Sequence, residues 1–210
     1  GERLHNYLAL GGADLTNTLA GNFTSATSTG NQSVTGVGFQ PDCVILLGAY
    51  RPTTGAVGGA FLALGGFTAT EQWALGFSDN DNAATTDSSR RQRTDKCFTQ
   101  LGPSGSLEQE ATFVSMDSDG FTINWGTANG TGRIIGYLAL KGCQVKMGAI
   151  SQKTSTGTQA YTGVGFQPVG LLTASFGDPA STATQDTARF SVGAARSATA
   201  RAATGAGSQD

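Results

Sequence analysis

The chain carries one stretch of fourteen residues twice. Residues 28–41 read STGNQSVTGVGFQP and residues 155–168 read STGTQAYTGVGFQP, so eleven of the fourteen positions are identical at a constant offset of 127 residues. The similarity extends upstream, where residues 3–12 (RLHNYLALGG) align with residues 133–142 (RIIGYLALKG). A period of about 130 residues is too long for a solenoid unit and has the size of a whole domain. The repeat therefore predicts tandem domains of related fold.

The phase of the repeat divides the chain into three parts. Residues 1–12 correspond to the closing strand of a repeat, residues 13–142 to a complete copy, and residues 143–210 to an incomplete second copy. That last part contains no counterpart of ATFVSMDSDGFTINW at 111–125. We expect a fragment of a longer string of domains. The alternative is that the N-terminal strand completes the unfinished copy, in the same chain or in a neighbour, by strand addition at an open edge.

Farther along the chain the alignment of the two copies depends on shorter segments. CVILLGA at 43–49 aligns with GLLTASF at 170–176. We align QWALGFS at 72–78 with RFSVGAA at 189–195, at an offset of 117 residues. This alignment places Trp73 opposite Phe190 and implies a shorter connection in the second copy.

The composition favours an all-β protein. Charged residues are 13% of the chain, against about 25% in an average protein. Short β-branched and aromatic segments alternate with clusters of Gly, Ser, Thr and Asn, which is typical of strands and turns. The 38% hydrophobic residues, with eleven Phe and two Trp, can fill a core. A net charge of −2 gives no general attraction to nucleic acid, and no apolar run approaches the roughly 20 residues of a membrane span.

A hairpin at residues 111–125 is the clearest local element. Its return strand alternates apolar and polar residues, with Phe121, Ile123 and Trp125 on one face, and an Asp-Gly pair supplies the turn. About one strand per 10–14 residues predicts nine or ten strands per copy, as in an antiparallel, jelly-roll-like β-sandwich. The other strands are expected near 43–49, 60–64, 72–77, 134–140, 144–150, 170–176 and 188–194, with 134–140 central because it is almost wholly apolar.

The repeated TGVGFQP segment has a structural explanation. Its two glycines allow a tight or bulged path, its Phe can close one end of the core, and its Pro favours an extended entry into the next strand. We interpret the segment as a sandwich corner, without chemistry. The residues that mark the repeat are Phe39, Pro41, Phe166, Pro168, Trp125, Tyr7 and Tyr137.

Catalytic and metal-binding patterns are weak in this sequence. His5 is the only histidine, so a catalytic triad or a histidine metal site would depend on it alone. The oxygen-rich segments 78–82 and 117–120 are better explained as turns than as calcium sites. Cys43, Cys97 and Cys143 are too scattered for a disulfide framework or a zinc site. We therefore assign no catalytic, cofactor-binding or metal-binding residue and expect no enzyme and no cofactor.

The one dense basic run is RRQRTDK at residues 90–96. A solvated loop is the simplest interpretation. The alternative is a subunit-docking patch for an acidic neighbour, in which Arg side chains form oriented ion pairs. Nucleic acid is not expected, because no aromatic residues interleave with the charges. The candidate docking residues are Arg90, Arg91, Arg93 and Lys96.

Four motifs together resemble a repeat of tailed-bacteriophage virion proteins. They are TGVGFQPD at 35–42, SSRRQ at 88–92, DGFTINW at 119–125 and GYLALKG at 136–142. The resemblance covers the complete copy and the first half of the next. It implies a structural, decoration or tail-associated protein on the outside of a phage particle. The partners implied are other virion proteins and further copies of the chain, with neither nucleic acid nor membrane involved.

Two other functions stay open at this point. A carbohydrate-binding, lectin-like module that recognises host glycans predicts that Trp73 or Tyr161 is exposed in a groove. A glycan hydrolase associated with a fibre predicts carboxylates gathered in a cleft around Glu108 or Asp117, close to Glu110 and Asp119.

Overall fold

The structure is a computed structural model that describes residues 9–52, 58–80, 88–176, 183–185 and 189–207. Its described part consists of strands and one short 3-10 helix, and the strand pairs are antiparallel. The expected all-β class is therefore confirmed. His5 and Tyr7 lie outside the described residues.

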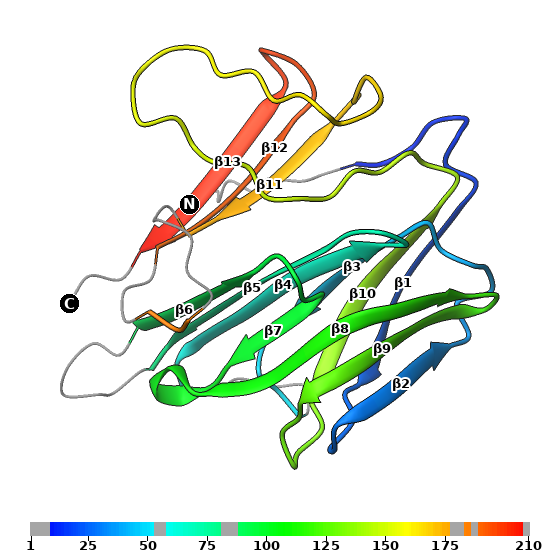
Figure 1. The fold of residues 1–210 in the computed structure, drawn as a ribbon, viewed down its shortest axis with the longest axis vertical. Coiled ribbons are helices and arrows are strands. Elements are labelled where there is room, and N and C mark those ends of the chain that lie inside the picture. The colour runs from blue at the N-terminus through cyan, green and yellow to red at the C-terminus, as the bar shows by residue number, and fades with distance from the viewer. Residues whose placement is uncertain (1–8, 53–57, 81–87, 177–182, 186–188, 208–210) are drawn as a thin grey trace, which may run out of the picture.

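Ten strands between residues 17 and 141 form two facing sheets, which together make a β-sandwich (Figure 1). The larger sheet has the order β1-β10-β3-β4-β5-β6. Its strands are β1 (Asn17–Thr24), β3 (Cys43–Gly48), β4 (Ala60–Thr68), β5 (Gln72–Asp79), β6 (Ser88–Arg93) and β10 (Ile134–Lys141). Strand β10 lies between β1 and β3, as its apolar sequence predicted.

The smaller sheet has the order β2-β9-β8-β7. Its strands are β2 (Gly30–Thr35), β7 (Phe98–Leu101), β8 (Leu107–Asp117) and β9 (Gly120–Thr127), and the 3-10 helix η1 (Pro103–Gly105) connects β7 to β8. The β8–β9 hairpin is the one expected from the sequence, with Asp117 paired to Gly120 across the turn. Gly120 has φ +148°, a backbone conformation that favours glycine at this turn.

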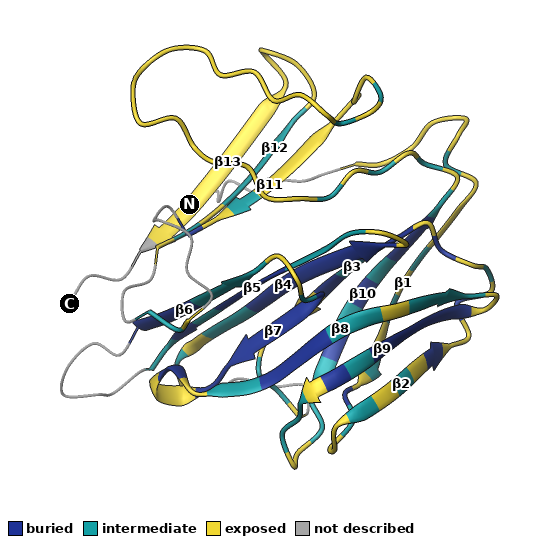
Figure 2. Cartoon of the chain, viewed as in Figure 1, coloured by how far each residue is buried: buried dark blue, intermediate teal, exposed yellow. Residues whose placement is uncertain are grey.

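Aromatic side chains from both sheets meet in one core. Phe121 and Trp125 of β9 are fully buried. Phe121 lies against Phe67 of β4 and Tyr137 of β10, with ring centroids 5.3 and 5.6 Å apart, and Trp125 lies edge-on to Phe98 of β7 at 5.9 Å. Figure 2 shows the buried residues concentrated on the strands of the two facing sheets. The alternation along β9 therefore directs its large apolar residues into the core.

Glycine permits a close approach on the inner face of the larger sheet. A Cβ added to Gly65 of β4 would lie 2.1 Å from the carbonyl oxygen of Cys97, which directly precedes β7. The neighbouring Gly66 faces the opposite side, where a Cβ would lie 3.1 Å from Cε of Met147. The Gly-Gly pair in β4 thus lets backbone and side chains pack closely on both faces.

The expected strand at 144–150 is wrong. This segment crosses the outer face of the larger sheet, where Met147 covers Gly66, and it does not run along a strand edge. The carboxylate of Glu71 holds it there by accepting hydrogen bonds from Lys146 Nζ and from the backbone N–H of Met147, the latter at 2.8 Å. The free backbone N–H and C=O groups of a sheet lie at its edges, so a segment that crosses the face of the sheet cannot pair with it as a further strand.

Three further strands form a separate sheet in the order β11-β12-β13 above the sandwich (Figure 1). Its strands are β11 (Leu171–Ser175), β12 (Arg189–Ala195) and β13 (Arg201–Gly207). Figure 2 shows that much of this sheet is exposed. Between β11 and β12, the backbone of Gln185 exchanges two 3.0 Å hydrogen bonds with Arg90 of β6 in the sandwich.

The strand order of the third sheet resembles that of β3, β4 and β5 in the larger sheet. Strand β12 lies between β11 and β13, as β4 lies between β3 and β5. Continuing each pairing register places Phe176 opposite Phe190 and Tyr50 opposite Phe61. Both pairs are in ring contact, with centroids 6.1 and 5.0 Å apart. The cross-strand partner of Phe190 thus resembles that of Phe61 in β4, whereas the sequence alignment placed Phe190 opposite Trp73 of β5.

Candidate functional site

The first copy of the repeated loop is bound to the turn of the β8–β9 hairpin. The backbone N–H groups of Gly36 and Gly38 donate to Asp119 Oδ2 and Oδ1, at 3.0 and 2.6 Å. The N–H of Val37, between them, donates to the backbone oxygen of Asp119 at 3.2 Å. Successive N–H groups that converge in this way form a concave site for an anion.

Positive φ angles make this convergence possible. Gly36 and Gly38 have φ +82° and +83°, values that L side chains rarely adopt. The hydrogen bonds from Gly38 and Gly36 lower the pKa of the Asp119 carboxyl below its ordinary value, because both stabilise the charged form. The two glycines are therefore explained by their contact with a carboxylate as well as by the bend in the chain.

Side chains extend the contact on both sides of the loop. Gln40 Nε2 donates to the backbone oxygen of Met116 at 2.7 Å. Val37 and Pro41 are buried, and Phe39 packs against the core. The expected role of Phe39 at the end of the core is confirmed. The site is thus a loop that holds a hairpin by four hydrogen bonds and an apolar contact.

Sequence reasoning missed the pairing of this loop with Asp119. The sequence identified the loop as a corner and Asp119 as a turn residue, but the two glycines and Asp119 are 83 and 81 residues apart. One sequence signal connected them: the Asp-Gly turn and the Gly-Val-Gly loop both belong to the four motifs that resemble phage virion proteins.

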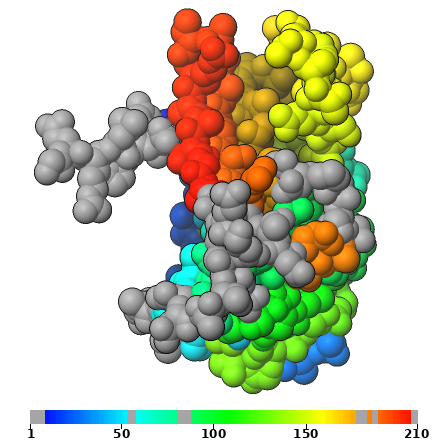
Figure 3. Space-filling model, turned by 90° about the vertical axis from the view of Figure 1, so that its left-hand side faces the viewer, coloured from blue at the N-terminus to red at the C-terminus, as the bar shows by residue number. Residues whose placement is uncertain are grey.

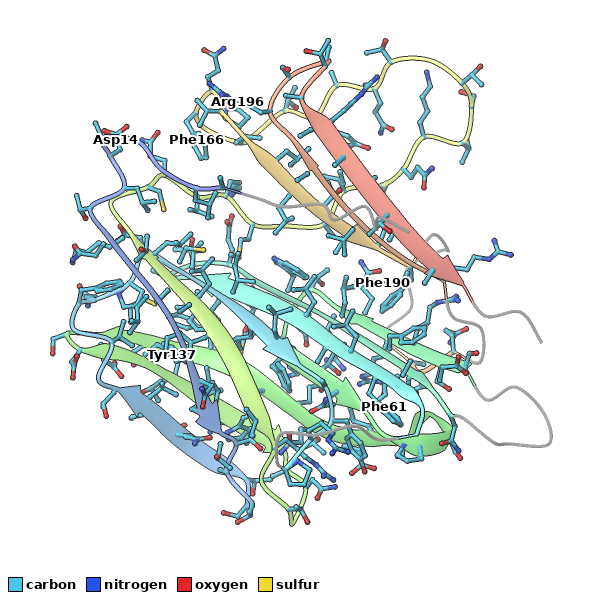
Figure 4. The ribbon with its side chains drawn as sticks, turned by 180° about the vertical axis from the view of Figure 1, so that it is seen from behind. Asp14, Phe61, Tyr137, Phe166, Phe190 and Arg196 are labelled. Atoms are coloured by element: carbon cyan, nitrogen blue, oxygen red, sulfur yellow. The ribbon has the colours of Figure 1, made fainter. Side chains whose placement is uncertain are left out.

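Among the described residues, the second copy of the loop has no such partner. Its marker residues Phe166 and Pro168 lie just before β11, and Figure 4 shows Phe166 well separated from the sandwich sheets that contain Tyr137. Pro168 is exposed, whereas Pro41 in the first copy is buried. The structure therefore places the two copies of one motif in different surroundings.

The candidate docking residues lie on or near an edge strand, not in a solvated loop. Arg90, Arg91 and Arg93 belong to β6, and Lys96 follows it. Arg91 Nε lies 3.0 Å from Glu110 Oε1, and Arg93 Nη1 lies 3.4 Å from Glu110 Oε2. The loop prediction was wrong because Ser88–Arg93 pairs along β5.

Two further contacts engage the basic residues within the chain. Arg93 binds Asp95 through two hydrogen bonds of 2.8 and 2.7 Å, and these lower the pKa of Asp95 to about 2. Lys96 Nζ donates to Thr112 Oγ1 at 3.2 Å. The basic run therefore serves, at least in part, to join the end of β6 to strand β8 of the smaller sheet.

Two of the four candidate hydrolase carboxylates, Glu108 and Asp117, are not brought together. Glu108 and Asp117 lie near opposite ends of β8, and nine residues of extended strand span roughly 30 Å. Paired carboxylates of glycosidases lie about 5–10 Å apart. Glu108 binds Asn129 and Ser106, and Asp117 binds Ser115 and Thr122. Both carboxylates are thus used locally.

An open depression of about 510 Å³ lies at one end of the sandwich, beside the first repeat loop. It is lined by residues 40–42, 68–70 and 113–116, together with Cys143 and Val145. The candidate sugar-binding aromatics are not among these residues. Trp73 is half-buried in β5, and Tyr161 is exposed with its hydroxyl donating to the Ser151 backbone oxygen at 3.0 Å. Neither Trp73 nor Tyr161 therefore supplies an aromatic surface for sugar binding in this depression.

The three cysteines are free thiols. Cys43 and Cys97 are buried, as expected for small hydrophobic side chains, and burial raises the pKa of Cys43 to about 12. No group of three or more His, Cys, Asp or Glu side chains in the described residues is arranged to hold a metal ion. Within the same part of the chain, no helix is long and apolar enough to cross a membrane.

A comparison of the chain with protein-family models, with curated proteins and with solved structures found no match. The function proposed below is therefore argued from the geometry and the sequence motifs.

Proposed function

We propose that the chain is a non-enzymatic structural protein on the exterior of a bacteriophage particle, where it decorates the capsid or forms part of the tail or fibre. The observation that supports this proposal is the structural role of the residues in the sequence motifs. In the complete copy, Phe39, Pro41, Trp125 and Tyr137 all build the sandwich, and the loop glycines bind the hairpin turn. These contacts stabilise an architecture.

A tandem arrangement of jelly-roll-like modules is part of this proposal. Residues 13–142 form the complete module, and residues 143–210 begin a second one. The support is the shared sequence, the equivalent strand order of β11-β12-β13 and β3-β4-β5, and the matched aromatic pairs at the ends of the hairpins. Residues 1–12 belong to a preceding or partner module because they repeat the β10 sequence.

The partners in this proposal are other virion proteins and further copies of the chain. The exposed third sheet offers β-strand edges and the exposed apolar side chains of Leu171 and Leu172, and Val169, just before β11, is 84% exposed. An exposed sheet of this kind is suited to association through strand addition and burial of apolar surface.

Peptide mass spectrometry on density-purified particles tests the proposal. Peptides of the chain at a copy number stoichiometric with known particle proteins are the expected result. Recovery of the chain only from the soluble fraction, with none in the particles, would overturn the virion assignment. A glycan array run on the same protein would then be the next measurement.

A further inference from the structure

The second copy of the repeated loop keeps the backbone conformation of the first. Gly163 and Gly165 have φ +84° and +85°, against +82° and +83° for Gly36 and Gly38. The residues between and after them are also identical, with the sequence TGVGFQP at 162–168 and at 35–41. The second loop therefore presents the same donors in the same local geometry.

In the first copy these donors are all used by one hairpin turn. Three backbone N–H groups contact Asp119, and the side-chain amide of Gln40 contacts the Met116 backbone oxygen. In the second copy the equivalent donors are the N–H groups of 163–165 and the Gln167 amide. None of these has a hydrogen-bond partner within the described part of the chain.

The apolar part of the contact is uncovered in the same way. Val37 is 4% exposed beneath the first hairpin, whereas its counterpart Val164 is half-buried and Pro168 is exposed. Figure 3 shows the segment around residues 150–165, in yellow, at the outer surface of the molecule. The second loop is thus open both to a carboxylate and to an apolar neighbour.

The strand that leads into each loop differs correspondingly. In the first copy, β2 pairs with β9 from Gly30 to Thr35, and Gln32 Oε1 accepts a 2.7 Å hydrogen bond from Trp125 Nε1. In the second copy, residues 157–162 form no strand, and Gln159, the counterpart of Gln32, instead donates to the Ser151 backbone oxygen. This segment matches β2 at three of six positions, Gly157, Gln159 and Thr162, but pairs with no strand in the described part of the chain.

We propose that residues 157–168 form a docking site for a β-hairpin with an Asp-Gly turn, supplied by a module of the same repeat type. The hairpin's turn carboxylate would accept hydrogen bonds from the N–H groups of Gly163 and Gly165. Its second strand would pair with residues 157–162, as β9 pairs with β2. The partner is specified by chemistry, because the same loop sequence in the same conformation binds this hairpin in the first copy.

The site has the properties that such a partner requires. Backbone N–H groups that converge on a carboxylate form charge-assisted hydrogen bonds, and these are stronger than neutral ones. Pairing with a strand adds main-chain hydrogen bonds, while the alternate apolar side chains of the hairpin supply specificity. Binding of a hairpin to this loop does not require that the chain belongs to a virus particle. A negative result for hairpin binding would therefore not refute the virion proposal, and a negative result for the virion proposal would not refute hairpin binding.

A synthetic hairpin provides the test. The probe is a fluorescent, disulfide-cyclised peptide with the sequence of residues 111–127, used only after its NMR spectrum shows a folded hairpin, because an isolated hairpin is marginally stable in water. It is titrated into the full chain and followed by fluorescence anisotropy and by NMR of the glycine amides. We expect saturable binding with downfield shifts at Gly163 and Gly165.

Matched variants make the result specific. A peptide with the substitution equivalent to Asp119→Asn is expected to bind about tenfold more weakly or worse, since it loses the charged acceptor. Gly163→Ala in the chain should weaken binding similarly, because alanine strains the positive φ although no atom lies within 4 Å of its Cβ. Gly148→Ala, at an exposed glycine that also has no neighbour within 4 Å, is the control and should leave binding unchanged.

Several results would overturn the proposal. One is a folded peptide that leaves the amides of Gly163 and Gly165 unshifted. Another is equal binding of the Asp and Asn peptides. Shifts at Gly36 and Gly38 alone would mean that the peptide only displaces the chain's own hairpin. If inorganic phosphate reproduced the shifts and competed fully with the peptide, the loop would be a general anion site and not a docking site for a hairpin.

Discussion

Replacement of Phe121 by alanine is expected to lower the free energy of unfolding of the sandwich by about 3–5 kcal/mol. Phe121 is fully buried, and its ring lies 5.3 to 6.1 Å from the rings of Phe67, Tyr137 and Phe23. Loss of the buried ring removes about 2–3 kcal/mol of transfer free energy. A residual cavity of about 100 Å³ would add roughly 2 kcal/mol, less whatever the neighbouring rings recover by relaxing.

Equilibrium unfolding in guanidinium chloride measures this loss. The fluorescence of Trp125 reports on the sandwich, because that side chain is fully buried in the same core. Phe121→Leu should cost only about 1–2 kcal/mol, since it keeps most of the apolar volume. Phe190→Ala is the matched control in the third sheet, where the side chain is half-buried. If Phe121→Ala cost no more than Phe190→Ala, the assignment of Phe121 to the centre of the core would be refuted.

Three further predictions concern single contacts. Gly65→Ala should destabilise the sandwich by about 2–3 kcal/mol in the same unfolding assay, because its Cβ would lie 2.1 Å from the Cys97 carbonyl oxygen. The control is Gly126→Ala, which has no atom within 4 Å of its Cβ and should change stability by less than about 0.5 kcal/mol. Glu110→Gln should cost about 2–4 kcal/mol, because it leaves the guanidinium groups of two β6 arginines without their shared carboxylate, and an unchanged denaturation midpoint would contradict this. The pKa of Asp119 is lowered in the folded state, so the stability that its carboxylate contributes is present above the ordinary carboxyl pKa of about 3.9 and is lost as the pH falls through the lower folded value. An NMR titration of Asp119 with a midpoint at or above the ordinary value would contradict this.

The sequence predicted best those elements whose signals are local. The alternation of Phe121, Ile123 and Trp125 and the following turn chemistry were sufficient for the β8–β9 hairpin. The continuous apolar run at 134–140 was sufficient for the central position of β10. Both signals arise within one strand, so no knowledge of the partner strands was needed.

Edge strands and surface segments were predicted less well. Strands β1, β2, β6 and β7 were not expected, because their sequences are polar or short and give no clear alternation. The segment 144–150 has apolar residues at strand spacing, yet it lies across a sheet face. In each case the presence or absence of a neighbouring strand edge decided the structure, and that neighbour is remote in sequence.

By itself, the sequence determined that the chain is all-β and that it contains two copies of one loop. It also determined the shape of that loop, because two glycines separated by one residue adopt the same positive φ angles in both copies. Only the tertiary structure decided that the first loop binds the carboxylate of Asp119 and that the second, within the described residues, has no such acceptor. The physical reason is that backbone conformation is local, whereas the acceptor must be brought from more than 80 residues away by the pairing of β2 with β9.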